Sequence, residues 1–214
     1  MDRQFKIKIC GLTRDRDVQR ILELGADYCG FIVYPKSPRG LDLAAASGLA
    51  SQVPEGKRVV VDVEPSVEQL KTYQLAGFDY FQIHTRGAFD AARCAEWSGV
   101  VGPERLWLAP RLAPNEAFPS DCLKYARTIL LDTYSKNQVG GTGQTGDWGQ
   151  FAELSKAHPD TTWILAGGLS PENALDAIAQ TGAEHLDFNS GVESAPGVKD
   201  HTTLEALFRA LGRV

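Results

Sequence analysis

The chain has 214 residues, of which 43% are hydrophobic and 23% are charged, and its formal net charge is −5 at pH 7. This composition is ordinary for a globular protein with one sizeable core, and no Lys/Arg-rich block indicates nucleic acid or a membrane surface as a partner. No apolar run approaches the roughly 20 residues of a membrane helix. Lys6 and Lys8 also interrupt the apolar stretch near the N-terminus, so we expect no signal peptide.

Short β-branched apolar segments recur along the whole chain and are typical of buried strands. Segments with helical periodicity lie between them. The predicted strands are Lys6–Cys10, Tyr28–Val33, Arg58–Asp62, Tyr80–Ile83, Arg105–Leu108, Thr128–Asp132, Thr162–Ala166 and His185–Asn189. The predicted helices are Asp15–Leu24, Leu43–Gln52, Val67–Leu75, Ala88–Trp97, Trp148–Ala157, Pro171–Gln180 and Leu204–Leu211, and residues 113–125 are expected to be irregular.

Local capping signals set several of these boundaries. Ser66 and Gln69 fit a capping box, and Ser170 before Pro171 is typical of an N-cap followed by proline at the first helical position. Three junctions repeat the phrase of a helix-ending glycine, two residues and a strand. The phrases are Gly25-Ala26-Asp27-Tyr28, Gly77-Phe78-Asp79-Tyr80 and Gly182-Ala183-Glu184-His185.

Alternating strands and helices predict an α/β fold with a parallel sheet. Eight near-equal units in this length favour a single-domain (β/α)8 TIM barrel over residues 1–214, rather than a doubly wound open sheet. The cysteines Cys10, Cys29, Cys94 and Cys122 are widely spaced and form no C-x-x-C pair. We therefore expect free thiols and a cytoplasmic protein without a metal site.

Two strand ends carry groups that can move protons. Cys10 ends the first predicted strand and Asp132 ends the sixth, so a barrel would bring both to its C-terminal rim. A thiol and a carboxylate there suggest a general base and a general acid. The alternatives are a small buried hydrophobe for Cys10 and a loop-anchoring carboxylate for Asp132.

Glycine-rich turns follow the last strands. Gly140-Gly141-Thr142-Gly143 comes after the sixth strand, Gly167-Gly168 after the seventh and Ser190-Gly191 after the eighth. Backbone amides in such turns can approach an anion, and barrels often bind phosphate after strands seven and eight. The sequence therefore predicts a phosphorylated small molecule as ligand.

Three further residues are candidates for substrate contact. Arg39 lies in a loop that two prolines stiffen, where its guanidinium could bind a carboxylate, although a solvated loop arginine is the ordinary alternative. His84 ends the fourth strand and either orients substrate or satisfies a backbone group. Asp187 lies in the eighth strand and either lines the mouth or fills a polar layer of the barrel.

Taken together, these segments resemble the phosphoribosylanthranilate isomerase family over essentially the full length. The matching phrases, in chain order, are Lys8-Ile9-Cys10-Gly11-Leu12-Thr13, Gly30-Phe31, Tyr34-Pro35-Lys36-Ser37-Pro38-Arg39, Leu130-Leu131-Asp132, Gly140-Gly141-Thr142-Gly143 with Asp147-Trp148, Gly167-Gly168-Leu169 with Pro171-Glu172-Asn173, Asp187, Ser190-Gly191-Val192-Glu193 and Pro196-Gly197-Val198-Lys199-Asp200.

The resemblance implies a cofactor-free Amadori rearrangement of N-(5-phosphoribosyl)anthranilate in tryptophan biosynthesis, catalysed by a monomer or homodimer. Asp132 would protonate the furanose ring oxygen as general acid, and Cys10 would remove the C2′ proton as general base. Arg39 would hold the anthranilate carboxylate. Gly167, Gly168, Ser190 and Gly191 would hold the phosphate.

Several positions depart from the family pattern. Asp62 stands where an aromatic or apolar residue is usual, and its carboxylate would either repel an anionic substrate or cap the next turn. Thr85-Arg86 follows His84 in place of a glycine, Pro110-Arg111 replaces Lys-Ala, and Asn189 replaces serine. These changes bear on affinity and specificity rather than on the type of reaction.

Two other functions remain open from the sequence. One is a related enzyme on the same barrel, such as another aldose-phosphate isomerase, an indole-glycerol-phosphate-synthase-like lyase or an enzyme for the histidine-pathway aminoaldose. The lyase is disfavoured because no lysine lies at a strand end to act as its acid. The histidine-pathway isomerases use paired aspartates, and Cys10 at the end of the first strand argues against that reaction. The other is a phosphate-ligand-binding barrel without turnover.

Overall fold

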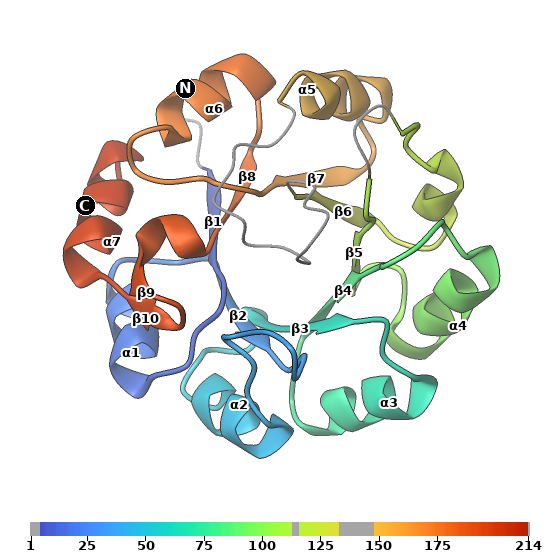
Figure 1. The fold of residues 1–214 in the computed structure, drawn as a ribbon, viewed down its shortest axis with the longest axis horizontal. Helices are drawn as coiled ribbons and strands as arrows, with labels where there is room; N and C mark the ends of the chain where they lie inside the picture. Colours follow the sequence, from blue (N-terminus) through green and yellow to red (C-terminus); the bar gives the residue numbers. More distant parts are fainter. Residues whose placement is uncertain (1–4, 113–115, 133–147, 214) are drawn as a thin grey trace.

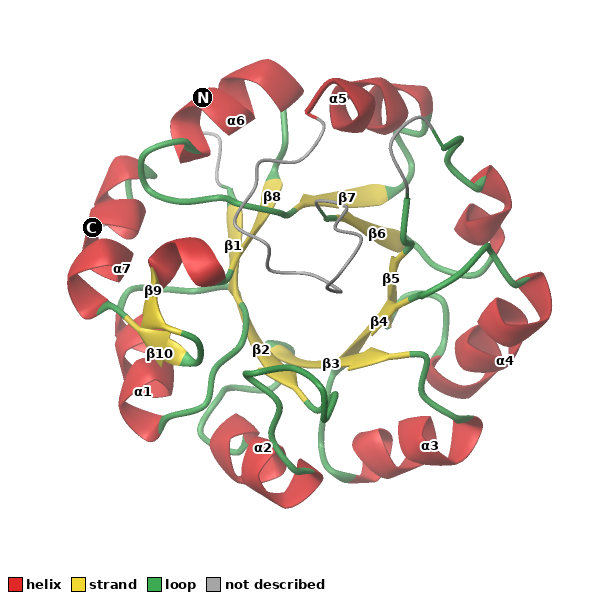
Figure 2. Ribbon diagram, in the orientation of Figure 1, coloured by secondary structure: helices red, strands yellow, loops and turns green. Residues whose placement is uncertain are grey.

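The structure is a computed structural model that describes residues 5–112, 116–132 and 148–213. Eight parallel strands close into a barrel in the order of the chain, and the helices lie outside it (Figures 1 and 2). This confirms the predicted barrel fold. The strands are β1 Lys6–Ile9, β2 Tyr28–Ile32, β3 Arg58–Val63, β4 Tyr80–His84, β5 Leu106–Ala109, β6 Thr128–Leu131, β7 Thr162–Leu165 and β8 His185–Phe188.

The helices alternate with the strands, and an additional hairpin follows the last barrel strand. The α-helices are α1 Asp15–Glu23, α2 Leu43–Ala50, α3 Val67–Leu75, α4 Ala91–Val101, α5 Trp148–Ala157, α6 Ala174–Thr181 and α7 His201–Ala210. The short elements are the 3-10 helices η1 Ser120–Lys124 and η2 Ser190–Val192 and the antiparallel strands β9 Glu193–Ala195 and β10 Val198–Lys199. None of the described helices is long and apolar enough to cross a membrane.

Side chains alternate between the inside of the barrel and the layer under the helices, as the period of two in a strand requires. The inward cluster includes Cys10, Val59, Val61, Leu130 and Ile164. At the strand starts, the rings of Tyr28, Tyr80 and Trp107 pack within 5.0–5.6 Å of one another. These aromatic rings pack at the N-terminal end of the barrel, opposite the C-terminal rim at which barrels of this fold carry their active sites.

Capping residues explain where the helices begin. Ser66 and Gln69 form the predicted capping box at α3. The helix predicted from Ala88 begins at Ala91, because the Asp90 carboxylate accepts from the Arg93 amide. The last helix begins at His201 rather than Leu204, since the Asp200 carboxylate accepts from the Thr203 amide.

The predicted start of the sixth helix is wrong. Its N-cap is Asn173 rather than Ser170, and Pro171 lies in the turn before the helix. The Asn173 side chain bonds the Ser170 amide at 2.9 Å and the Gly168 carbonyl at 2.9 Å. These bonds shape the turn after β7 and delay the helix to Ala174.

Candidate active site

Cys10 follows β1 and its side chain lies inside the barrel, 3% exposed. Its amide donates to the Phe188 carbonyl at 2.9 Å and so continues the contact between β1 and β8 beyond the last strand residue. The thiol is therefore held on the first and last strands, where the barrel closes.

Beside this thiol lies a buried ion pair. Lys8 and Asp187 face each other as partners in the β1–β8 register, and Lys8 Nζ lies 2.9 Å from Asp187 Oδ1. A Cβ on Gly30 would lie 2.9 Å from Cys10 Sγ and 3.0 Å from Lys8 Nζ, so the thiol and the ammonium are neighbours over the bare backbone of β2. Asp187 is thus part of the polar layer of the barrel.

Burial and charge act in opposite directions on these groups. Burial raises the pKa of the Cys10 thiol, while the nearby ammonium groups of Lys8 and Lys199 lower it in part. Burial alone would lower the pKa of Lys8, but attraction by Asp187 and Cys10 outweighs it and leaves that pKa above its ordinary value. Lys8 therefore keeps its charge, and its ammonium offsets part of the rise that burial causes in the pKa of the Cys10 thiol.

Asp132 directly follows β6 and is partly exposed. It shares its parity with Leu130, whose side chain belongs to the inward cluster. Two strands, β7 and β8, separate it from β1 in the closed barrel. The fold therefore brings Cys10 and Asp132 to the same rim from different strands, as predicted.

His84 ends β4 on the inward face. Its Nε2 lies 2.9 Å from Gln82 Nε2, and because an amide nitrogen only donates, His84 accepts through Nε2. Burial, aided by the charge of Lys8, lowers the pKa of His84 to about 4. The imidazole is therefore neutral at neutral pH.

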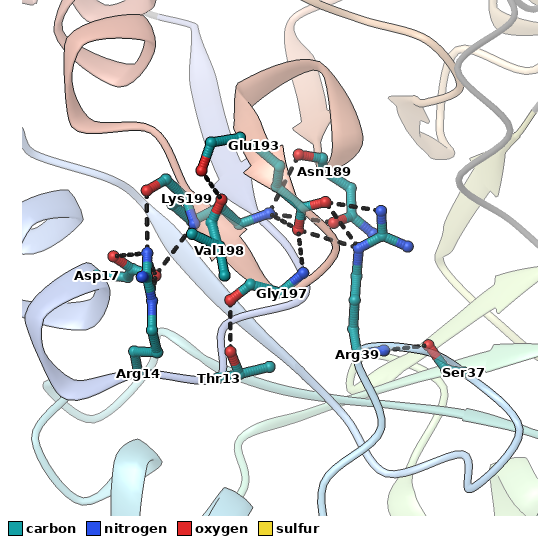
Figure 3. Close-up of polar contacts among 11 residues, drawn as sticks. Thr13, Arg14, Asp17, Ser37, Arg39, Asn189, Glu193, Gly197, Val198 and Lys199 are labelled. Atoms are coloured by element: carbon teal, nitrogen blue, oxygen red, sulfur yellow. Dashed lines mark hydrogen bonds and ion pairs between the residues drawn. The ribbon is translucent and has the colours of Figure 1, made fainter.

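Arg39 lies in the loop between β2 and α2, is 6% exposed, and makes a two-point ion pair. Its Nε lies 3.0 Å from both carboxylate oxygens of Glu193, and its Nη2 lies 2.7 Å from Glu193 Oε2 (Figure 3). The residue predicted to hold a substrate carboxylate thus already contacts a carboxylate of the protein.

A buried lysine continues this network. Lys199 Nζ lies 2.9 Å from Glu193 Oε1 and donates to the backbone and side-chain oxygens of Asn189, both at 3.1 Å (Figure 3). Burial opposes ionisation of Glu193, but the hydrogen bonds from Arg39 and the charge of Lys199 hold its pKa below the usual value. Asn189, one of the departures from the family pattern, is therefore a partner of Lys199.

The turns after β7 and β8 lie against each other. Gly167 and Gly168 have φ of 88° and 65°, in the left-handed region that favours glycine. A Cβ on Gly191 would lie only 2.1 Å from the Leu169 carbonyl oxygen, so only a glycine there lets the two turns approach. Gly167, Gly168, Ser190 and Gly191 thus lie in two adjoining turns at one part of the rim, and phosphate binding by these turns stays a prediction. Gly141 lies outside the described residues.

Asp62 does not face the barrel mouth. Its Oδ2 accepts from the Tyr73 hydroxyl of α3 at 2.7 Å and its Oδ1 from the Val63 amide at 2.8 Å. Since its neighbours Val61 and Val63 have the other parity, this carboxylate lies on the helix side of the sheet. Asp62 therefore ties β3 to α3, in place of the predicted alternatives of repelling the substrate or capping the next turn.

The other departures contact one another. The Arg86 guanidinium lies 5.2 Å from the centre of the Tyr34 ring and donates to its hydroxyl at 3.0 Å. Arg111 donates from its amide to Thr85 Oγ1 and from its side chain to the Arg86 carbonyl, both at 3.0 Å. Thr85, Arg86 and Arg111 therefore join the loops that follow β2, β4 and β5.

Comparison with known proteins gives this arrangement a family. The family model of N-(5′-phosphoribosyl)anthranilate isomerase matches residues 7–210. The chain belongs to this family. The isomerase of Synechococcus elongatus is 36% identical over 98% of this chain and 97% of its own, and that of Pseudomonas putida is 38% identical over 95% and 96%.

Solved structures of phosphoribosylanthranilate isomerases also match. The Thermotoga maritima enzyme has a TM-score of 0.80 at 29% identity and covers 98% of this chain and all of its own. Another isomerase, in complex with reduced 1-(o-carboxyphenylamino)-1-deoxyribulose 5-phosphate, has a TM-score of 0.76 at 27% identity over 98% of this chain. The match therefore extends over the whole barrel.

Three buried residues of this site, Lys8, Glu193 and Lys199, had no role predicted from the sequence. Lys8 has the parity of Cys10, so the period of two already placed both on one face. Glu193 and Lys199 belong to phrases shared with the isomerase family, but only the β9–β10 hairpin brings them to Arg39. In the described ranges, no three His, Cys, Asp or Glu side chains gather as a metal site would require.

Proposed function

We propose that this chain converts N-(5-phosphoribosyl)anthranilate into 1-(2-carboxyphenylamino)-1-deoxyribulose 5-phosphate, an Amadori rearrangement in tryptophan biosynthesis. The observation that carries the proposal is the family match over residues 7–210, with Cys10 buried beside a cationic lysine on the matching barrel. The structure that binds the reduced product analogue supports this class of ligand.

In the proposed reaction, the carboxylic acid of Asp132 protonates the furanose ring oxygen. The C1′–O bond breaks, and the anilino nitrogen supplies the electron pair that forms the Schiff base. The Cys10 thiolate then takes the C2′ proton, and the electron pair of that C–H bond flows toward the nitrogen. The resulting enolamine tautomerises to the ketone, so no oxidant or reductant is consumed.

The other predicted residues supply binding. Arg39 would hold the anthranilate carboxylate, and Gly141, Gly167, Gly168, Ser190 and Gly191 would surround the phosphate. His84, neutral and inward-facing, would contact the substrate, and Asp187 would act near it through Lys8. The ammonium groups of Lys8 and Lys199 each lower the pKa of Cys10 in part, and they place positive charge where an anionic substrate and an anionic base would come together.

The barrel closed by β1 and β8 supports a single domain over residues 1–214. The absence of disulfides among four buried cysteines is in keeping with the predicted cytoplasmic location.

The test is a coupled assay in which a phosphoribosyltransferase makes the substrate from anthranilate and phosphoribosyl pyrophosphate. We expect protein-dependent loss of substrate fluorescence and a product with a ketone carbon by 13C NMR that resists acid hydrolysis to anthranilate. The NMR signal is needed because substrate and product are isomers of equal mass. Decay at the spontaneous rate, with only anthranilate recovered, would rule out the proposed reaction.

A further inference from the structure

Arg39 presents two separate edges for carboxylate binding. A guanidinium offers one pair of donors along the edge of Nε and Nη2 and a second pair along the edge of Nη1 and Nη2. Glu193 occupies the first edge at 2.7–3.0 Å. Among the residues that the structure describes, no hydrogen bond involves Arg39 Nη1, which lies on the side of the guanidinium away from Glu193 (Figure 3).

The aliphatic stem of Arg39 lies close to the backbone beside Cys10, the proposed base. A Cβ on Gly11, the residue after Cys10, would lie 2.7 Å from Arg39 Cδ and 2.6 Å from Asn189 Oδ1. The backbone that carries Cys10 is thus directly beside the arginine stem. A ligand whose carboxylate meets the free edge of Arg39 is therefore close to the thiol.

The charges of the cluster also leave room for one more anion. The three residues are buried together. Arg39 is 6% exposed, Lys199 is 3% exposed, and the side chain of Glu193 is 3% exposed. Arg39 and Lys199 share the one carboxylate of Glu193, and burial lowers the pKa of Lys199. Among the described residues, the second edge of Arg39 therefore has no carboxylate partner, and a substrate carboxylate would supply one.

From these observations we propose that Glu193 is a positioning residue that holds Arg39 by one edge and turns the other toward the carboxylate of the substrate. Lys199 holds Glu193 in place through its 2.9 Å ion pair. This inference rests on the proposed function, since it assumes that an aromatic carboxylate binds at this rim. It assigns carboxylate selectivity to a residue that itself does not touch the substrate.

The test uses two ligands that differ in one group. The first is reduced 1-(o-carboxyphenylamino)-1-deoxyribulose 5-phosphate, and the second is the same compound without the carboxylate. Calorimetry gives a Kd for each ligand. The Kd of the ligand without the carboxylate, divided by the Kd of the ligand with it, measures how much the carboxylate contributes. The variants are Glu193→Ala, Glu193→Gln, Arg39→Met and the double variant Glu193→Ala with Arg39→Met.

We expect Arg39→Met to bring the ratio close to one and Glu193→Ala to lower it at least tenfold. The double variant should then resemble Arg39→Met, because Glu193 acts only through Arg39. In steady-state kinetics, Glu193→Ala should raise KM at least tenfold with kcat changed only a few-fold, as expected for lost uniform binding. Glu193→Gln, which keeps the shape, should have an intermediate ratio.

The matched control is Glu205→Gln, which changes a glutamate of α7 whose side chain pairs at 2.6 Å with Arg20, a residue outside this cluster. Its ratio should equal that of the wild type. Partial unfolding weakens both ligands alike and leaves the ratio unchanged, so the ratio separates positioning from stability. A Glu193→Ala protein with the wild-type ratio would overturn the inference, whereas a wild-type protein that binds neither ligand would overturn the proposed function with it.

Discussion

Lys8 on β1 and Asp187 on β8 are register partners whose charged groups meet at 2.9 Å inside the barrel, at the seam where the first and last strands close it. Both are buried, with side-chain exposures of 1% and 8%. An ion pair out of water is held because each partner offsets the desolvation of the other. The pair therefore joins barrel closure to the electrostatics of the neighbouring thiol.

Removing one partner of this pair should be far more damaging than removing both. Lys8→Met leaves Asp187 buried and unpaired, and we expect it to lower the free energy of unfolding by about 3–5 kcal/mol. The double variant Lys8→Met with Asp187→Leu should recover most of that loss but not the activity. Urea unfolding measures both, with Lys6→Met, an exposed partner of Asp27, as a control that costs at most about 1 kcal/mol. A Lys8→Met protein as stable as this control would contradict the prediction.

The proposed acid and base should be needed for turnover and not for folding. Cys10→Ala and Asp132→Asn should each lower kcat by about 10²–10⁴-fold, the usual contribution of a positioned acid or base. Circular dichroism and the thermal midpoint should stay near the wild-type values, because Asp132 is partly exposed and Cys10→Ala removes only one sulfur atom from the barrel interior. Wild-type-like turnover in either variant would remove that residue from the mechanism.

His84 should make stability depend on pH. Its pKa falls from 6.5 to about 4 on folding, so between these values the unfolded chain binds a proton that the folded protein does not. The contribution of neutral His84 to the free energy of unfolding is therefore complete above about pH 6.5. It is lost as the pH falls toward 4, by about 3 kcal/mol in all. Urea unfolding at pH 7 and pH 4 measures it. His84→Asn should flatten this part of the profile, and an unchanged slope in the variant would assign the effect to other groups.

The Asp62–Tyr73 contact should matter for stability alone. Tyr73→Phe removes the 2.7 Å hydrogen bond to a buried carboxylate, which costs about 1–3 kcal/mol when the acceptor loses its partner. Because Asp62 lies on the helix side of β3, kcat and KM should be unchanged. Thermal unfolding and the coupled assay separate the two effects, and a changed KM would indicate that Asp62 reaches the substrate.

Periodicity and capping were enough to predict most of the fold. Each of the eight strands was predicted to within one residue at either end, because each is an apolar, β-branched run between helical patterns. The errors at helix starts come from side chains whose partners the apolar pattern does not reveal. The carboxylates of Asp90 and Asp200 cap α4 and α7, whereas the Asn173 side chain bonds the turn before α6.

The sequence by itself determined the barrel and the chemical types of the candidate residues, because strand periodicity and the phrases around Cys10, Asp132 and the glycine turns are local features. Only the tertiary structure decided which charges neutralise one another. Lys8 meets Asp187 only because the barrel closes, and Glu193 meets Arg39 only because a hairpin folds over the loop after β2. Pairings between residues 179 and 154 positions apart depend on the closed fold and leave no local pattern in the chain.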